Sequence, residues 1–146
     1  MVRTVDQQAQ WLSLKIGHED FAINVQYIRE LIPRQTVTAR NLTDQSIEGF
    51  TYFRDQVLSV INGVIKLGVD YPRSQADEGG LFVIFDVSPQ PFALSVTAVG
   101  NIFELSPRDI APYSVSNNPA ITGVARRTCG GLMLVLDPTK LIELRE

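Results

Sequence analysis

The chain has 146 residues, 45% of them apolar, and its 13 basic and 16 acidic side chains give a net charge of −3 at pH 7. This length suits one compact domain, and the interspersed charges include no Lys/Arg cluster that would follow a nucleic-acid backbone, which excludes nucleic acid as an expected partner. Because no apolar run reaches the roughly 18 residues of a membrane span and a lone cysteine forms no internal disulfide, we expect a cytoplasmic protein without membrane insertion.

The first predicted elements are a hairpin and a short helix. Apolar residues alternate in residues 11–16 and again in 21–25, and the turn-forming segment 17–20 separates the two runs. From residue 25 the apolar spacing becomes that of a helix, and Pro33 ends the pattern. We therefore predict strand, turn, strand and a helix of about two turns.

A second hairpin is predicted around Arg54 and Asp55. Residues 47–53 and 56–61 are strongly apolar, so the two charges between them must lie on a tight turn that projects from the core. Asp tolerates the positive φ of such a turn better than most residues. Two strands hold this tip rigidly, and a guanidinium makes planar, forked hydrogen bonds, so Arg54 suits a partner contact as well as a solvated tip.

The second half contains four more predicted strands and a terminal helix. Residues 70–80 are polar and rich in turn formers, and we interpret them as a connecting loop. The predicted strands are residues 81–87, 92–96, 99–105 and 132–137. Asp137 followed by Pro138 is typical of a helix N-terminus, so we predict a helix over about 138–144.

The two halves repeat the same order of segments. FAINV recurs as FALSV, SIEGF as AITGV, and QVLSVINGVIKL as GLMLVLDPTKL. Phe21 thus corresponds to Phe92 and Val60 to Val135, at nearly the same separation along the chain. This pattern indicates two related β-units, each too small to bury a core alone. We place subdomain 1 at about residues 10–70, the connecting loop at about 70–80 and subdomain 2 at about 81–136.

The inventory of reactive side chains argues against catalysis. The only histidine, His18, lies in a predicted turn, and the only cysteine, Cys129, precedes a predicted strand, so neither a zinc site nor a nucleophile–base pair is expected. The carboxylates Glu30, Glu48, Asp55 and Glu104 are scattered, and a solvated surface explains most of them. We therefore predict no enzyme activity, no metal and no cofactor.

Several segments together resemble CheW-like domains, the scaffold proteins of bacterial chemosensory arrays. The likeness covers about residues 11–144 and rests on FAINVQYIRELI, IEGFTYFRDQVLSVINGVIKLG, LFVIFD, FALSV and ITGVARRTCGGLMLVLDPTKL. The central segment of that family usually reads I-x-G-x-x-N-L-R-G, then an apolar strand and D-L. This chain departs from it at Tyr52, Asp55 and Asn62, which replace Asn, Gly and Asp.

The resemblance implies a mainly β fold of two five-stranded SH3-like barrels packed together, with short helices that include one at the C-terminus. It also implies a non-catalytic adaptor that couples the cytoplasmic tips of methyl-accepting chemoreceptors to a CheA-type histidine kinase through its regulatory domain. By correspondence with the family, Ile28, Glu30, Ile47, Gly49 and Arg54 would line the receptor- or kinase-binding region. The protein would then be recruited to membrane-associated receptor arrays.

Two other interpretations remain open at this point. The departures at Tyr52, Asp55 and Asn62 are compatible with a divergent adaptor of a pilus-type or other specialised chemosensory system, or with part of a longer protein, although we expect a free-standing single domain. A general β-barrel module that binds peptides is the second alternative. Binding of single-stranded nucleic acid would need aromatic and basic side chains interleaved, and only Tyr52, Phe53 and Arg54 fit that requirement.

Overall fold

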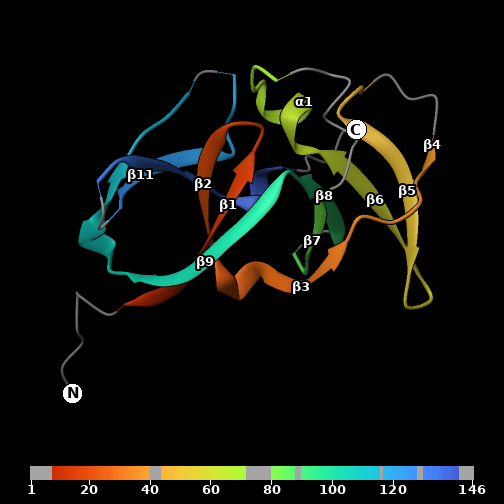
Figure 1. Cartoon of the computed structure of the whole chain (residues 1–146), viewed down its shortest axis with the longest axis horizontal. Helices are drawn as coiled ribbons and strands as arrows, with labels where there is room; N and C mark the ends of the chain where they lie inside the picture. The colour runs from red at the N-terminus through yellow and green to blue at the C-terminus, as the bar shows by residue number, and fades with distance from the viewer. Residues whose placement is uncertain are drawn as a thin grey trace.

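The strands form two six-stranded sheets that lie side by side in Figure 1. The computed structural model describes residues 8–39, 44–71, 80–87, 90–115, 117–127 and 130–141. Sheet 1 has the order β10 (Ile110–Pro112), β11 (Ile121–Arg126), β12 (Leu132–Leu136), β2 (Glu19–Asn24), β1 (Ala9–Ile16), β9 (Ala98–Leu105). Sheet 2 has the order β3 (Ile28–Pro33), β7 (Leu81–Phe85), β8 (Phe92–Val96), β6 (Gln56–Asn62), β5 (Ile47–Phe53), β4 (Thr38–Ala39). The predicted mainly β fold is confirmed.

Three apolar clusters explain why the sheets curl and pack. The largest cluster joins the two sheets, and β1 and β2 supply one side of it and β7 and β8 the other. On the sheet 2 side, the ring centres of Phe85 and Phe92 are 5.2 Å apart. The other two clusters lie within single sheets. One joins β9 and β10, the two outer strands of sheet 1, and the other draws on strands from β3 to β5 of sheet 2. This curvature is consistent with the predicted SH3-like barrels, although each sheet has six strands instead of five.

The sheets do not divide the chain where the sequence analysis placed the boundary. All the described strands of sheet 2 come from residues 28–96, whereas sheet 1 combines the β1–β2 hairpin, residues 9–24, with the strands of residues 98–136. The predicted subdomains at 10–70 and 81–136 therefore each contain strands of both sheets. The reason is that β2 pairs in parallel with β12 and β8 pairs in parallel with β6, so each half contributes its first hairpin to the sheet of the other.

The strand pairing reproduces the sequence repeat in register. Ala22 is opposite Val135 across β2 and β12, and Ala93 is opposite Val60 across β8 and β6, so the two pairs join equivalent positions of the repeat. A register shift also recurs, between Ile47 and Gly49 in β5 and at the equivalent place in β11. The fold is thus a duplicated unit whose leading hairpins have been exchanged.

Residues 25–32 do not form the predicted helix. A 3-10 turn, η1 (Val25–Tyr27), is capped by the Asn24 side chain and leads directly into β3. A two-turn helix is marginal on its own, and pairing with β7 satisfies the backbone of this segment instead. The register shift between Ile28 and Glu30 spaces the apolar residues so that they imitate a helical period.

Two short helices follow equivalent strands. Helix α1 (Gly63–Leu67) was not predicted; the Asn62 side chain accepts a hydrogen bond from the Ile65 amide at its start, and Gly68, at φ 68°, ends it. The second is η3 (Pro138–Lys140), which Asp137 caps as expected. The predicted continuation to residue 144 lies outside the described residues. A further 3-10 turn, η2 (Pro107–Asp109), joins β9 to β10.

Candidate docking surface on sheet 2

Arg54 and Asp55 form the two-residue turn between β5 and β6, as predicted. Phe53 is opposite Gln56 in the last pair of the ladder, and the φ angles of Arg54 and Asp55 are 50° and 63°. Two positive φ angles define the turn that matches the twist of antiparallel strands, but a side chain in this region costs about 1 kcal/mol. Arg54 is therefore held in a conformation that its own backbone preference disfavours.

The Arg54 guanidinium forms an ion pair with Glu30 of β3. Arg54 Nη2 lies 2.9 Å from Glu30 Oε2, and the same guanidinium lies over the Phe53 ring, 5.0 Å from its centre. Next to this pair, Arg29 Nη1 donates to Gln56 Oε1 at 3.2 Å. These contacts join β3 to the β5–β6 hairpin, and because the side chains of Arg54 and Glu30 are 66% and 31% exposed, the pair remains accessible.

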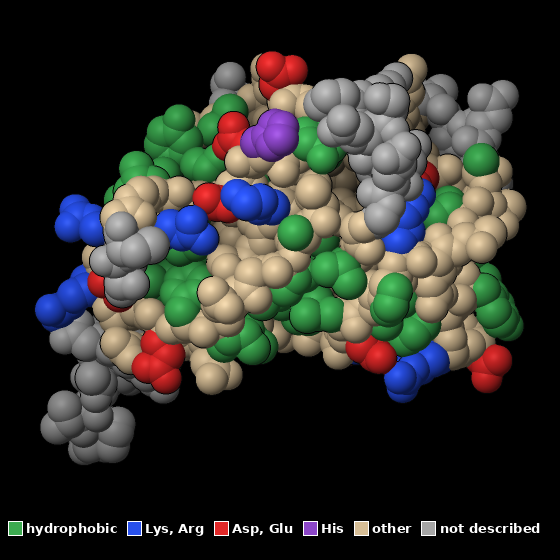
Figure 2. Space-filling model, in the orientation of Figure 1, with side chains coloured by type: hydrophobic (Ala, Val, Ile, Leu, Met, Phe, Trp, Pro, Cys, Tyr) green, Lys and Arg blue, Asp and Glu red, His purple; other side chains and the backbone are tan. Residues whose placement is uncertain are grey.

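Exposed apolar side chains accompany this ion pair. Tyr52 and Val57 are opposite one another across β5 and β6 and are 66% and 59% exposed, and Leu31 of β3 is 41% exposed. Figure 2 shows basic and acidic side chains next to hydrophobic ones along the lower right, where Figure 1 places β3 and the β5–β6 hairpin. Charged groups beside uncovered apolar ones are typical of a protein-binding surface.

The structure brings three of the five predicted site residues near one another. Glu30 contacts Arg54, and Ile28 is two residues from Glu30 on β3. Ile47 begins β5, roughly 20 Å of strand away from the tip at Arg54. Gly49 is buried, and a Cβ there would stand 2.0 Å from the Thr38 carbonyl oxygen, so its role in the fold is to let β4 approach β5.

A second arginine–glutamate pair was not anticipated. Arg34 forms an ion pair with Glu48, donates to Ser95 Oγ at 3.0 Å and lies over the Phe82 ring. Asn62 Nδ2 also donates to Glu48 Oε2, at 3.0 Å. Among the four scattered carboxylates, Glu48 is thus one that a solvated surface does not explain, because its side chain is only 13% exposed.

Among the described residues there is no group of His, Cys, Asp and Glu side chains that could hold a metal ion. His18 is exposed in the β1–β2 turn, with its ring edge against Tyr71, as expected for a turn residue. Cys129 lies outside the described residues. The candidate docking surface consists of the Glu30–Arg54 ion pair and the exposed side chains of Leu31, Tyr52 and Val57. It can bind a partner through charge pairs and apolar contacts, and none of its described side chains forms a recognisable nucleophile–base pair.

Comparison with known proteins decides the family. A family model described as the CheW-like domain matches residues 10–146 of the chain. The chain belongs to the CheW-like family. It is 23% identical over 151 residues to the chemotaxis protein CheW of Treponema pallidum (strain Nichols), with 97% of this chain and 86% of that protein covered.

A solved structure agrees with the CheW-like assignment. The scaffolding protein TtCheW from Thermoanaerobacter tengcongensis superposes with a TM-score of 0.82 at 18% identity, over 94% of each chain. The two chains therefore share a fold. The prediction that this chain is not an enzyme is confirmed by its place in the CheW-like family. No helix within the described residues has the length and apolar character needed to span a membrane.

Proposed function

We propose that this CheW-like chain couples the cytoplasmic tips of methyl-accepting chemoreceptors to the regulatory domain of a CheA-type histidine kinase. It would do so as a cytoplasmic adaptor recruited to receptor arrays. The observation that carries this proposal is the accessible Glu30–Arg54 ion pair beside exposed apolar side chains, on a chain of the CheW-like family. The proposed surface includes Ile28, Glu30, Ile47, Gly49 and Arg54.

The geometry supports different roles for these residues. Glu30 and Arg54 present one charge of each sign, so a receptor or kinase with complementary charges would be oriented as it docks, and wrong partners would be rejected. Ile28 and Ile47 are half-buried and extend the surface along β3 and β5. Gly49 contributes by setting the shape of the β4–β5 edge.

Binding of a receptor-tip fragment and of the kinase regulatory domain, measured separately by calorimetry, tests the proposal. Replacing Arg54 by Ala should leave folding intact and weaken at least one of the two associations by roughly 1–3 kcal/mol, as expected for a central charged contact. The double variant Glu30→Arg with Arg54→Glu keeps an ion pair between the two positions but exchanges the positions of the positive and negative charges. It should therefore also weaken binding.

The matched control is Lys66→Ala, which removes a cation from α1 at a distance from the ion pair and should leave both affinities unchanged. If the Arg54→Ala variant bound receptor tip and kinase domain as tightly as the parent protein, the surface would not be the docking site. If the parent protein bound neither partner, the coupling function itself would be refuted.

A further inference from the structure

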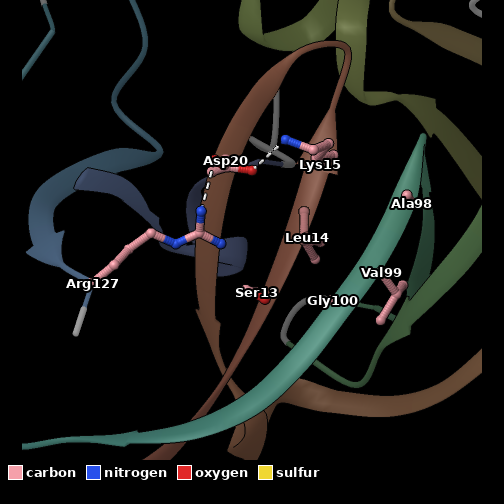
Figure 3. Close-up of a pocket in the computed structure, with 8 residues that line it drawn as sticks. All are labelled: Ser13, Leu14, Lys15, Asp20, Ala98, Val99, Gly100 and Arg127. Atoms are coloured by element: carbon pink, nitrogen blue, oxygen red, sulfur yellow. Dashed lines mark hydrogen bonds and ion pairs between the residues drawn. The ribbon is translucent and has the colours of Figure 1, made fainter. Parts of the chain in front are cut away.

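Sheet 1 contains a small pocket with a charged rim, which lies outside the residues proposed for docking. It has a volume of about 170 Å³, and its rim carries Lys15, Asp20 and Arg127. Ala98 and Gly100 of β9 and Ser13 also line it, together with Leu14 and Val99, which pack against the apolar cluster between the sheets. Figure 3 shows these residues around the space between β9, the β1–β2 hairpin and Arg127.

Two cations of this rim share one carboxylate. Lys15 Nζ lies 2.8 Å from Asp20 Oδ1, and Arg127 Nη1 lies 3.1 Å from Asp20 Oδ2. The lining therefore has one positive charge that Asp20 does not balance. In Figure 3 the other terminal nitrogen of Arg127 turns toward the middle of the ring of labelled residues.

The room in the pocket comes from two small residues. By the same offset that relates Phe21 to Phe92, Ser13 corresponds to Ile84, which is fully buried in the apolar cluster of sheet 2. Gly100 corresponds in the same way to Arg29. A Cβ at Gly100 would stand 2.3 Å from Ser13 Oγ, so the glycine lets β9 pass close to β1 at the site of the register shift. In sheet 2, the large side chain of Ile84 thus fills the position that stays open beside Ser13 in sheet 1.

We propose that this pocket binds a carboxylate on a short aliphatic stem, the chemistry of an acidic side chain of a peptide. Arg127 and Lys15 would hold the carboxylate, and Ala98 and Gly100 would receive the methylene groups. A volume of 170 Å³ accommodates several heavy atoms, since a water molecule occupies roughly 30 Å³. Asp20 keeps the two cations in place while the pocket is empty, and it opposes the incoming anion.

The opposing role of Asp20 distinguishes a binding site from an ordinary surface ion pair. Replacement of Asp20 by Asn removes a like charge and should tighten carboxylate binding roughly threefold to tenfold, the effect of one charge about 6 Å away at dielectric values of about 80 to 40. Arg127→Gln and Lys15→Gln should each weaken binding at least about threefold for the same reason. A purely structural ion pair would not produce these opposite signs.

The test is a titration of the isotope-labelled full chain, followed by amide chemical shifts. The probes are propionate, the capped tripeptide acetyl-Ala-Glu-Ala-amide, and its neutral isostere acetyl-Ala-Gln-Ala-amide. We expect saturable shifts at Ser13, Val99 and Gly100 with the first two probes and none with the third. Lys140→Gln is the control variant, because Lys140 of η3 is a cation that does not line this pocket.

Each outcome decides the question. Binding of both carboxylate probes, with the predicted signs for the variants, establishes an acidic side chain as the ligand. Binding of propionate without the Glu peptide assigns the pocket to free small carboxylates and overturns the peptide part of the proposal. No saturable shift with either probe, or equal shifts with the neutral peptide, overturns the site. The receptor and kinase are absent from this experiment, so its result is independent of the adaptor function.

Discussion

The two arginine–glutamate pairs of sheet 2 should respond very differently to the same substitution. Removing one partner of a buried pair typically costs about 3–5 kcal/mol because the other charge is left desolvated. Arg34 and Glu48 retain 19% and 13% exposure, which reduces the expected cost of Arg34→Met to about 2–4 kcal/mol. The Arg54–Glu30 pair is far more exposed, and Arg54→Met should cost less than about 1 kcal/mol.

Urea unfolding followed by circular dichroism measures this difference. With a slope of about 2 kcal/mol per molar urea, the unfolding midpoint of Arg34→Met should fall by roughly 1–2 M, against less than about 0.5 M for Arg54→Met. Arg34→Met combined with Glu48→Met should recover part of the loss, because no buried charge of the pair then remains. The recovery would be incomplete, since Asn62 loses the acceptor that Glu48 provides.

Equal midpoints for Arg34→Met and Arg54→Met would refute this reasoning, and so would a large loss for Arg54→Met. The contrast also bears on function. A charge pair that contributes little to stability is free to be rearranged by a partner, whereas the Arg34–Glu48 pair holds strands together. We therefore expect sequence changes at Arg54 and Glu30 to affect binding before they affect folding.

Three further predictions concern stability. Asn62→Asp places a second carboxylate beside Glu48 and should cost about 1–3 kcal/mol at pH 7, with the cost shrinking near pH 4 as one group takes a proton; a pH-independent loss in urea unfolding would contradict this. The backbone and side-chain hydrogen bonds from Ser106 lower the pKa of Asp109 below its usual 3.8. The stability that the Asp109 carboxylate contributes is therefore complete above pH 3.8 and is lost as the pH falls through the lowered pKa of the folded protein. Asp109→Asn should therefore lower the urea midpoint at pH 7 and approach the parent protein at pH 2.5, whereas a constant difference would count against the linkage. Leu136→Ala should cost about 2–5 kcal/mol through a cavity between the sheets, and an unchanged melting temperature would show that this side chain is not in the core.

The sequence predicts local features of this fold well. The turn at Arg54 and Asp55, the first hairpin and the cap at Asp137 depend on residues that are adjacent in the chain, and their chemistry is visible without coordinates. The repeat is also visible, because both copies keep the same order. These features arise from short-range preferences that each segment carries with it.

Apart from α1, which the neighbouring residues Asn62 and Gly68 cap, the features that were missed depend on pairing between distant segments. Residues 25–33 form a turn and a strand because β7 pairs with β3. The sequence of residues 25–33 alone does not indicate that this pairing occurs. Glu48 is isolated among the carboxylates in the sequence, and only the fold brings Arg34 and Asn62 to it. The exchange of hairpins between the halves leaves the order of segments along the chain unchanged. The repeat in the sequence therefore suggested two consecutive units.

The exchanged hairpin has a consequence for how the chain is made. As synthesis proceeds from the N-terminus, sheet 2 has all its described strands once residue 96 has emerged. The β1–β2 hairpin must wait for residues 98–105 and 132–136 before both of its open edges are covered. Unpaired strand edges invite association with other chains. Nascent chains should therefore pass through a long stage with one sheet complete and an uncovered hairpin at the leading end, and this is the stage at which a chaperone would protect them most.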